Sequence, residues 1–374
     1  MSKRLCCIFR RPALYREPIH RLMEASFDID WHFGDDEQDI KSYDVSILKH
    51  CNTLHVKMLF GSLYYAKGEL GLLFSKKYDT YLMLNSTHNV SVWVFALCKR
   101  LFFRKKRVYY WCHGWYGKET GMEGFIKRSL FKAANGVFTY GERARQLLME
   151  QGFDGNKIWP IHNSLNHEQQ VALRKSGLKS TVYQEYFGNS QPVLLFIGRL
   201  TKVKQLDMLI EALSRLYDQG QDFNLVLVGD GEQRQMLQEF AKSKGLADRI
   251  WFYGACYDEQ TNAKLIYNAD LCVAPGNIGL TAMHSLVFGT PCLTHDSFEW
   301  QMPEVEAVKE GQTGTFFKRN DVTSLTESIC QWFSVHQDRE AVRQACYDEI
   351  DNYWTPQFQI GIMKSKLLSE DKIR

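Results

Sequence analysis

The sequence predicts an α/β protein with two domains, each built around a parallel β-sheet. Two observations carry this prediction. The chain has 374 residues, which is more than one ordinary hydrophobic core requires. Short apolar runs that are typical of buried strands alternate with amphipathic runs of helical length, and this pattern favours parallel strands joined by right-handed crossovers.

In the first half of the chain, apolar runs predict five strands. They are LCCIFR near the start and the runs at 78–84, 107–114, 136–141 and 157–163. Amphipathic stretches at 88–103 and 122–134 predict helices between them. The polar segment 165–190 separates two sets of buried strands, so it is the predicted linker region.

From residue 192 the alternation becomes sharper. The predicted strands are PVLLFIGRL, FNLVLVGDG, RIWFYG, DLCVAPG and PCLTHD. The predicted helices between them are LDMLIEALSRLYDQ, EQRQMLQEFAKSKG, 259–268 and 281–288. Near the end, DNYWTPQFQIGIMKSKLL predicts a terminal helix.

The composition indicates a globular protein and limits its partners. Hydrophobic residues make up 45% of the chain and charged residues 24%, which excludes a disordered protein. The net charge of +3 is too small to indicate nucleic acid, so no such partner is predicted. The ten cysteines show no Cys-x-x-Cys pair and no zinc-type spacing, which favours reduced thiols. Without an apolar run typical of a signal peptide or a membrane span, we expect a cytoplasmic protein.

Two cations follow the first strand of the second predicted domain. The strand LLFI ends at Gly198 and Arg199, and Lys204 comes five residues after Arg199. Cations at the carboxyl end of a parallel strand can clamp an anion, most naturally a diphosphate. The alternative interpretation is a pair of solvated charges at the entrance of a helix.

The next strand ends in Gly229-Asp230-Gly231, which is similar to the start of a dinucleotide-binding fingerprint. Arg234 stands where the third glycine would be, and this disfavours a nicotinamide oxidoreductase. The glycines either make a tight turn only or let a ligand approach the backbone.

The stretch PGNIGLTAMHSLVFGTP at 275–291 predicts a strand end, a glycine turn and a short helix. Backbone N–H groups from Ile278 to Thr281 would point outward with the positive end of the helix dipole, which suits a phosphate. Thr281 can cap the helix or bond a phosphate oxygen. His284 lies one turn further along and can bond a ribose hydroxyl, while a packing role is the alternative.

In the first predicted domain, His113 and Gly114 follow the strand RVYYWC. A histidine at the carboxyl end of a strand can bond a substrate or move a proton, and a structural loop histidine is the alternative. His162 and Asn163, after KIWPI, are a weaker example of the same pattern. The sequence has no Asp-x-Asp or other convincing metal cluster, so no metal or cofactor is predicted.

Taken together, these segments resemble a retaining glycosyltransferase of the GT-B fold, family 4 (group 1), of the bacterial surface-polysaccharide type. The resemblance runs through FIGRLTKVKQLDMLIEAL, LVLVGDGEQ, WFYGACYDEQ, the 275–291 stretch and EVEAVKEGQTGTFF, and it is loose in the first domain. It implies two Rossmann-like domains facing a central cleft. Residues 1–170 would bind the acceptor, residues 190–349 would bind a nucleotide-sugar, and a C-terminal helix at 350–374 would cross back to the first domain.

The resemblance also implies roles for the matching residues. Arg199 and Lys204 would hold the donor diphosphate, the 278–281 turn would contact phosphate and sugar, and His113 would contact the transferred sugar. Cys256 would lie near the base. The predicted catalytic residues are His113, Arg199 and Lys204, and the predicted substrate-binding residues are Gly198, Gly231, Cys256, Asn277, Ile278, Gly279, Leu280, Thr281 and His284.

One departure from the family pattern concerns its two glutamates, which are separated by seven residues. The first faces the sugar and the second bonds the ribose, and here those positions are Gly276 and His284. His284 can still bond a ribose hydroxyl, whereas Gly276 cannot replace a carboxylate and Asn277 is the neighbouring candidate. The pattern G-N-x-G-L-x-x-x-H-S, followed by QMPE at 301–304, resembles a bacterial polysaccharide subgroup, and this similarity favours a working enzyme.

The resemblance implies a metal-independent hexosyltransferase with a nucleotide-sugar donor, most often a UDP-sugar, and a saccharide or lipid-linked acceptor. Guanosine remains open as the base. The basic and aromatic run at 97–107 suits an anionic membrane surface at the inner face, with a solvated helix face as the alternative. The alternative functions are a nucleotide-sugar epimerase of similar fold and a non-catalytic nucleotide-sugar-binding partner of another transferase.

Overall fold

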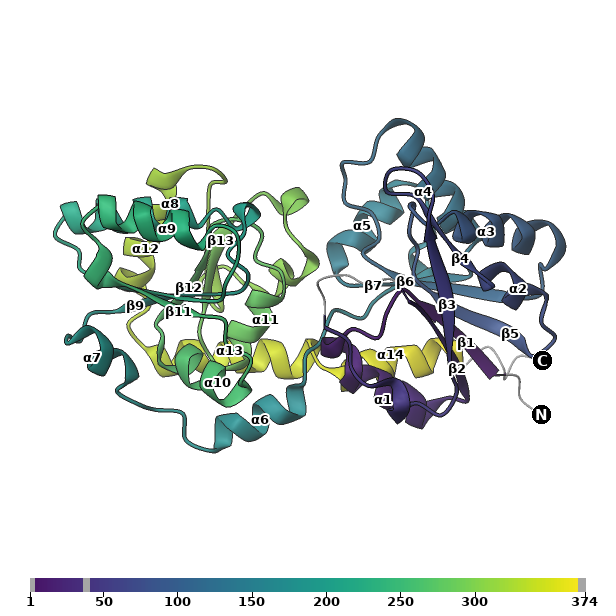
Figure 1. Ribbon diagram of the computed structural model, residues 1–374, viewed down its shortest axis with the longest axis horizontal. Helices are drawn as coiled ribbons and strands as arrows, with labels where there is room; N and C mark the ends of the chain where they lie inside the picture. Colours follow the sequence, from purple (N-terminus) through teal and green to yellow (C-terminus); the bar gives the residue numbers. More distant parts are fainter. Residues whose placement is uncertain (1–3, 36–40, 369–374) are drawn as a thin grey trace. The chain divides into compact units, whose positions relative to one another are not determined.

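A computed structural model describes residues 4–35 and 41–368 of the chain. The chain divides into two compact units (Figure 1). Unit 1 comprises Met1–Asn166 and Pro356–Arg374, and unit 2 comprises His167–Thr355. Each unit contains one mainly parallel sheet with helices packed against it, so the predicted α/β class with two Rossmann-like domains is confirmed.

The sheet of unit 1 has the strand order β4-β3-β2-β1-β5-β6-β7-β8. Its neighbouring strands are parallel, except that β3 and β4 form an antiparallel pair at one edge. The strands are β1 (Arg4–Phe9), β2 (Ile29–Gly34), β3 (Cys51–Met58), β4 (Tyr64–Lys67), β5 (Tyr78–Met83), β6 (Arg107–Cys112), β7 (Gly136–Thr139) and β8 (Ile158–Pro160). The sequence predicted β1 and β5 to β8, and it missed β2, β3 and β4.

Helices cover both faces of this sheet (Figure 1). They are α1 (Glu17–Ser26), α2 (Glu69–Phe74), α3 (Val90–Phe102), α4 (Gly121–Ala133), α5 (Glu142–Glu150) and α14 (Pro356–Leu367). Successive residues of β1 point to opposite faces, as the pleat of a strand requires. Cys6 and Ile8 join an apolar cluster with the α2 to α5 layer, whereas Cys7 and Phe9 join a second cluster with α1 and α14.

The sheet of unit 2 is parallel throughout, with the order β11-β10-β9-β12-β13-β14. Its strands are β9 (Val193–Ile197), β10 (Asn224–Val228), β11 (Ile250–Gly254), β12 (Leu271–Ala274), β13 (Cys292–His295) and β14 (Gly314–Phe317). The chain builds outward from β9 to β11 and then returns to place β12 on the other side of β9. Ligands of such sheets bind beyond the carboxyl ends of the strands at this reversal, so the loops after β9 and β12 frame the expected site.

The helices of unit 2 include two in the segment that was predicted to be a linker. Residues 165–190 contain α6 (His167–Lys175) and α7 (Val182–Phe187), and α6 packs against α10 within the unit. The other helices are α8 (Leu206–Asp218), α9 (Arg234–Ser243), α10 (Glu259–Asn268), α11 (Leu280–Val287), α12 (Val322–Val335) and α13 (Arg339–Tyr353). The polar composition of 165–190 therefore reflects surface helices.

The predicted terminal helix is interrupted. The helix α13 ends at Tyr353, and α14 begins at Pro356. A proline is accepted in the first turn of a helix but cannot continue the helix that precedes it, so Pro356 separates the two. α14 belongs to unit 1, where it packs beside α1. Residues 369–374 of the predicted helix lie outside the described residues.

Candidate functional site

The candidate site of unit 2 is formed by loops that follow β9, β10 and β12, and the first two loops are in backbone contact. A Cβ atom on Gly229 would lie 1.8 Å from the carbonyl oxygen of Gly198, and one on Gly231 would lie 2.5 Å from that of Leu200. The Leu200 amide donates to the Asp230 carbonyl at 2.9 Å. The paired glycines therefore let the β9 loop approach the β10 loop more closely than side chains would allow.

Gly276, in the loop after β12, meets the same β9 loop. A Cβ atom at this position would lie 2.0 Å from the Val203 carbonyl oxygen and 2.8 Å from Cα of Lys204. The Gly276 amide donates to the Lys204 carbonyl at 3.0 Å. The backbone that carries Lys204 thus occupies the space that a side chain at 276 would need. In this loop arrangement, glycine at 276 is a packing requirement.

Lys204 is fixed against the 275–279 turn. Its ammonium donates to the carbonyl oxygen of Asn277 at 2.5 Å. Burial, together with the charge of Arg199, lowers the pKa of Lys204 to about 8, while the charge of Glu304 acts in the opposite direction. The structure therefore brings the two predicted cations near each other, with Arg199 exposed and Lys204 half-buried. At neutral pH Lys204 is still mainly cationic.

The turn itself is held by Gln301, which the sequence named only as part of a motif. The amide of Ile278 donates to Oε1 of Gln301 at 2.9 Å. Nε2 of Gln301 donates to Oγ1 of Thr294 at 2.8 Å and to the His295 carbonyl at 3.2 Å. We expected the N–H of Ile278 to point outward. This expectation is wrong, because that N–H donates to the side-chain amide of Gln301.

Thr281 ties the first turn of α11 to the sheet, and anion binding at this turn stays a prediction. Oγ1 of Thr281 donates to the carbonyl oxygen of Ile197, the last residue of β9, at 2.7 Å, so the hydroxyl ties the helix to the sheet instead of capping it. The helix begins at Leu280 after Gly279. The amides of Leu280 and Thr281 have no earlier helical carbonyl to bond, as at any helix start.

His284 makes a contact that the sequence did not predict. Its Nε2 lies 3.0 Å from Oε1 and 3.1 Å from Oε2 of Glu259, the first residue of α10. Gln170 of α6 donates to the same carboxylate at 2.8 Å. Burial acts to raise the pKa of Glu259, but the hydrogen bonds from His284 and Gln170 hold that pKa below its usual range. Glu259 follows the WFYGACYD run, and nothing in its local sequence marked it as a partner.

Cys256 lies in the loop after β11 and is half-buried. Its thiol lies 3.6 Å from the Asp258 carbonyl oxygen, to which it donates a weak bond. Its predicted place near the base stays a prediction.

His113 lies in unit 1, after β6, among aromatic rings. Its ring centroid is 4.8 Å from that of Tyr140 and 5.9 Å from that of Tyr116. Burial, together with the charges of Arg16 and Lys127, lowers the pKa of His113 to about 4. Its Nδ1 is buried and has no hydrogen-bond partner within residues 4–35 and 41–368. The imidazole is neutral at neutral pH, and its role toward a transferred sugar stays a prediction.

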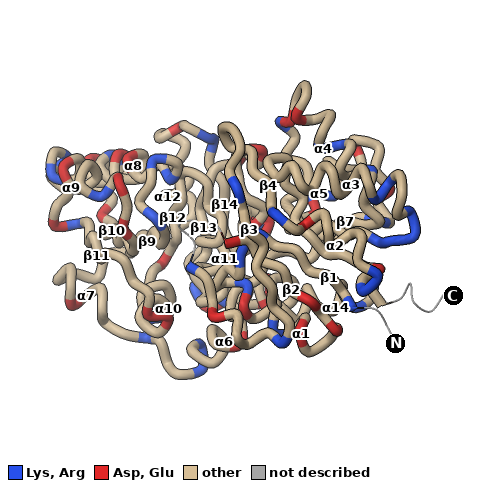
Figure 2. Tube along the Cα trace, turned by 45° about the vertical axis from the view of Figure 1, so that its right-hand side comes forward, with Lys and Arg blue, Asp and Glu red and all other residues tan. Residues whose placement is uncertain are grey.

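The basic run at 97–107 is only partly directed to solvent. Leu97, Leu101 and Phe102 of α3 are 57%, 53% and 73% exposed. Lys99 instead turns inward and donates to the Ala133 carbonyl at 2.9 Å. Lys106 likewise binds backbone carbonyls, whereas positions 100, 104 and 105 are exposed. Figure 2 shows the basic positions gathered where α3 ends. Among the helices of the described part of the chain, none has the length and apolar character that crossing a membrane requires.

Two Rossmann-like parallel-sheet domains, one with glycine-rich loops stacked at the reversal of its strand order, agree with the GT-B fold that this chain shares with solved structures. Residues 184–348, which make up most of unit 2, match the family described as Glycosyl transferases group 1.

Curated relatives match the chain over part of their length. A GDP-mannose-dependent alpha-(1-6)-phosphatidylinositol dimannoside mannosyltransferase of Mycobacterium tuberculosis is 38% identical over 115 residues, which are 30% of this chain and 29% of that protein. A D-inositol 3-phosphate glycosyltransferase of Nocardia farcinica is 25% identical over 214 residues, which are 54% of this chain and 46% of that protein. The chain therefore spans less than half the length of these relatives.

Solved structures match the whole fold at low identity. Anabaena Alr3699/HepE in complex with UDP has a TM-score of 0.74 at 15% identity, covering 98% of this chain and 100% of that chain. The apo form of the lipopolysaccharide outer core galactosyltransferase WaaB has a TM-score of 0.70 at 12% identity, covering 98% and 99%. At such identities the likeness shows a shared fold.

Proposed function

We propose that the protein is a retaining glycosyltransferase. It moves a sugar from a nucleotide-diphosphate sugar, preferably a UDP-sugar, to a glycan or lipid-linked saccharide in cell-surface polysaccharide synthesis. The observation that carries the proposal is the position of Lys204, which is bonded to the 275–279 turn at the carboxyl ends of β9 and β12. The family match over residues 184–348 supports it.

The donor diphosphate is the leaving group, and its developing charge needs stabilisation. Arg199, Lys204 and the first amides of α11 supply positive charge that is already in place before the reaction. The ammonium of Lys204 is held by the Asn277 carbonyl, so little reorganisation is needed when the charge develops. This arrangement works without a metal, and activity in the presence of a chelator tests that part of the proposal.

The ribose of the donor binds at His284 in this proposal. If Nε2–H donates to Glu259, Nδ1 is left as an acceptor for a ribose hydroxyl. The carboxylate fixes this tautomer, as a second-layer carboxylate commonly does for a functional imidazole. A single histidine and its partner thus take the place of the glutamate that the family carries at position 284.

The preference for uridine rests on the family and on the neighbour whose structure contains UDP. The mannosyltransferase relative is GDP-mannose-dependent, so guanosine is the competing base. A lipid-linked acceptor agrees with the exposed apolar and basic positions of α3, which we propose contact the inner face of the membrane.

The first experiment is calorimetry of UDP, UDP-glucose and GDP-mannose with EDTA present. The variants are Arg199→Ala and His284→Ala, and the matched control is Lys202→Ala, an exposed lysine of the same loop. We expect saturable binding of one donor that both site variants weaken and the control preserves. If no nucleotide or nucleotide-sugar binds at high protein concentration, the transferase proposal fails.

A non-catalytic nucleotide-sugar-binding protein is the second candidate, and Gly276 is the observation that favours it. The loop arrangement leaves no room for a carboxylate at 276. Donor binding without transfer to any acceptor in a broad panel would support this candidate. Conversion of the donor sugar to its epimer without an acceptor would instead identify an epimerase.

A further inference from the structure

A cavity of about 480 Å³ opens in unit 2 at the amino ends of β9 and β12. Its lining comes from the segment before β9, the end of α10, the end of α12 and the start of α13. Because the sheet is parallel, this edge is opposite the carboxyl ends that carry Lys204 and the 275–279 turn. A five-residue strand separates the two edges by about 16 Å, so the cavity is distinct from the donor site.

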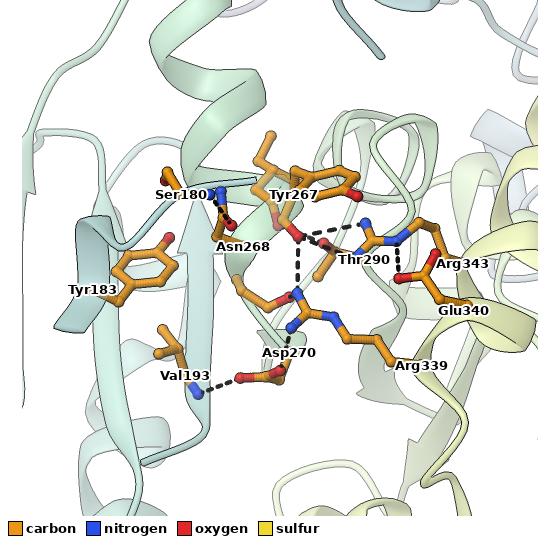
Figure 3. A network of polar contacts seen from close by, with 12 residues as sticks. Ser180, Tyr183, Val193, Tyr267, Asn268, Asp270, Thr290, Arg339, Glu340 and Arg343 are labelled. Atoms are coloured by element: carbon orange, nitrogen blue, oxygen red, sulfur yellow. Dashed lines mark hydrogen bonds and ion pairs between the residues drawn. The ribbon is translucent and has the colours of Figure 1, made fainter. Parts of the chain in front are cut away.

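Arg339 and Asp270, two charged residues of the lining, bond to each other and to backbone groups (Figure 3). Nη1 of Arg339 lies 2.8 Å from Oδ1 of Asp270, and its Nη2 donates to the carbonyls of Tyr267 at 2.8 Å and Ala269 at 2.7 Å. The other oxygen of Asp270 accepts from the Val193 amide at 2.7 Å. The charges of Arg339 and Asp270 therefore compensate each other, which disfavours a charged ligand.

The wall behind this pair is held by further contacts within the protein. The Arg343 guanidinium lies 3.7 Å from the centroid of the Tyr267 ring and donates to the Phe288 carbonyl at 3.1 Å. The Tyr183 hydroxyl donates to the Leu265 carbonyl at 2.6 Å. Such a wall does not need to be ordered by a ligand, which lowers the entropic cost of binding.

The remaining lining combines aromatic rings with amide side chains. Phe333 is half-buried and has ring surface left for a ligand, whereas the rings of Tyr183 and Trp332 are only 3% and 4% exposed and form the buried base of the lining, with Trp332 stacked on His336 at 3.8 Å. The side chains of Gln184, Gln191 and Gln337 line the cavity and make no hydrogen bond to any part of the chain that the structure describes. Amides can bond hydroxyl groups, while aromatic rings cover C–H surfaces.

We propose that this cavity is a non-catalytic binding site for a neutral saccharide of one or two sugar units. The volume lies in the range of small-molecule sites, and the combination of amides, the Phe333 ring and compensated charges suits a polyhydroxylated, uncharged ligand. A nucleotide is disfavoured because Arg339 is already bonded to Asp270 and two carbonyls. The site holds a glycan or senses a free sugar, and its binding requires no transfer step.

The test is saturation-transfer NMR of the full chain with maltose, lactose, sucrose and N-acetylglucosamine, with adenosine and inorganic phosphate as further probes. Ser190→Trp places a large ring at the cavity, and Ser243→Trp at the exposed end of α9 is its matched control. The double variant Gln191→Ala/Gln337→Ala removes two amides from the lining and keeps the test valid if Ser190→Trp does not fold.

We expect at least one saccharide to bind, with an affinity that falls at least tenfold in Ser190→Trp or in the double glutamine variant. Binding should be unchanged in Ser243→Trp and in Arg199→Ala. The proposal is overturned if no saccharide binds, if binding survives both cavity variants, or if adenosine or phosphate binds at the cavity instead. UDP calorimetry on the same samples separates this result from the proposed function, because donor binding should not change in the cavity variants.

Discussion

The imidazole of His284 and the carboxylate of Glu259 form a bonded pair in unit 2, with Nε2 at 3.0 and 3.1 Å from the two carboxylate oxygens. The two residues come from different helices: Glu259 begins α10, and His284 lies in the last turn of α11. In the proposed function, this pair lets an imidazole bind the ribose in place of a glutamate. The carboxylate fixes the orientation of the ring, and the second ring nitrogen becomes available to a ligand.

Removing the carboxylate should weaken donor binding through His284. We expect Glu259→Ala to raise the Kd for UDP by about 3- to 10-fold, since one oriented hydrogen bond contributes on the order of 1 kcal/mol. Glu259→Gln, which can still accept from Nε2–H, should lose less. Calorimetry measures both.

A double-mutant cycle gives the control. If Glu259 acts through the imidazole, Glu259→Ala should add little to His284→Ala. Fully additive losses would show that the two residues act independently and would contradict this prediction.

The low pKa of Lys204 predicts a pH dependence of donor binding. With a pKa of about 8 in the free protein, the ammonium is present below pH 8 and is lost above it. The affinity for UDP-glucose should therefore be highest near pH 7 and should fall toward pH 9. Lys204→Met should bind more weakly with a flat profile, and Lys202→Met, the neighbouring exposed lysine, should keep the wild-type profile. A wild-type affinity that is constant from pH 7 to 9 would contradict the role of Lys204.

The sequence predicted the fold class because local patterns determine it, and it failed where distant residues do. β2 was missed because it carries Asp30, a residue that is rarely buried. In the structure Asp30 is 1% exposed and is bonded by Arg4 at 2.9 Å and by the Tyr78 hydroxyl at 2.5 Å. Those partners lie 26 and 48 residues away, so no window around β2 contains the groups that compensate its charge.

The residues of the candidate site also fall into those that the sequence could predict and those that it could not. Arg199, Lys204 and the 275–279 turn could be predicted because parallel strands bring their carboxyl ends to one edge. Glu259 and Gln301 could not, because they reach the site from other elements and are selected by side-chain geometry. The space taken by the Lys204 backbone beside Gly276 is likewise visible only in three dimensions.

The exposed apolar positions of α3 predict binding to anionic membranes. We expect the protein to co-sediment with phosphatidylglycerol-containing vesicles more than with pure phosphatidylcholine vesicles, and less as salt is raised. Leu101→Ser/Phe102→Ser should reduce binding several-fold. The control is Met122→Ser/Phe125→Ser, which removes two exposed apolar side chains from α4. Equal losses in both variants, or no preference for anionic vesicles, would contradict a specific α3 contact.

Gly276→Ala tests whether the stacked loops build the donor site. The added Cβ would lie 2.0 Å from the Val203 carbonyl, so the loop that carries Lys204 has to shift. We expect a loss of about 1–3 kcal/mol in the free energy of unfolding, as for other overpacked sites, together with weaker UDP binding. Gly361→Ala in α14 is the matched control, because a Cβ atom there meets nothing within 4 Å. That variant should be neutral or stabilised by up to about 1 kcal/mol, since alanine favours a helix over glycine. Denaturation measures the stability of both variants, and calorimetry measures their UDP affinity. If Gly276→Ala is destabilised but keeps the wild-type UDP affinity, the close contact between Gly276 and the β9 loop serves folding and not the donor site.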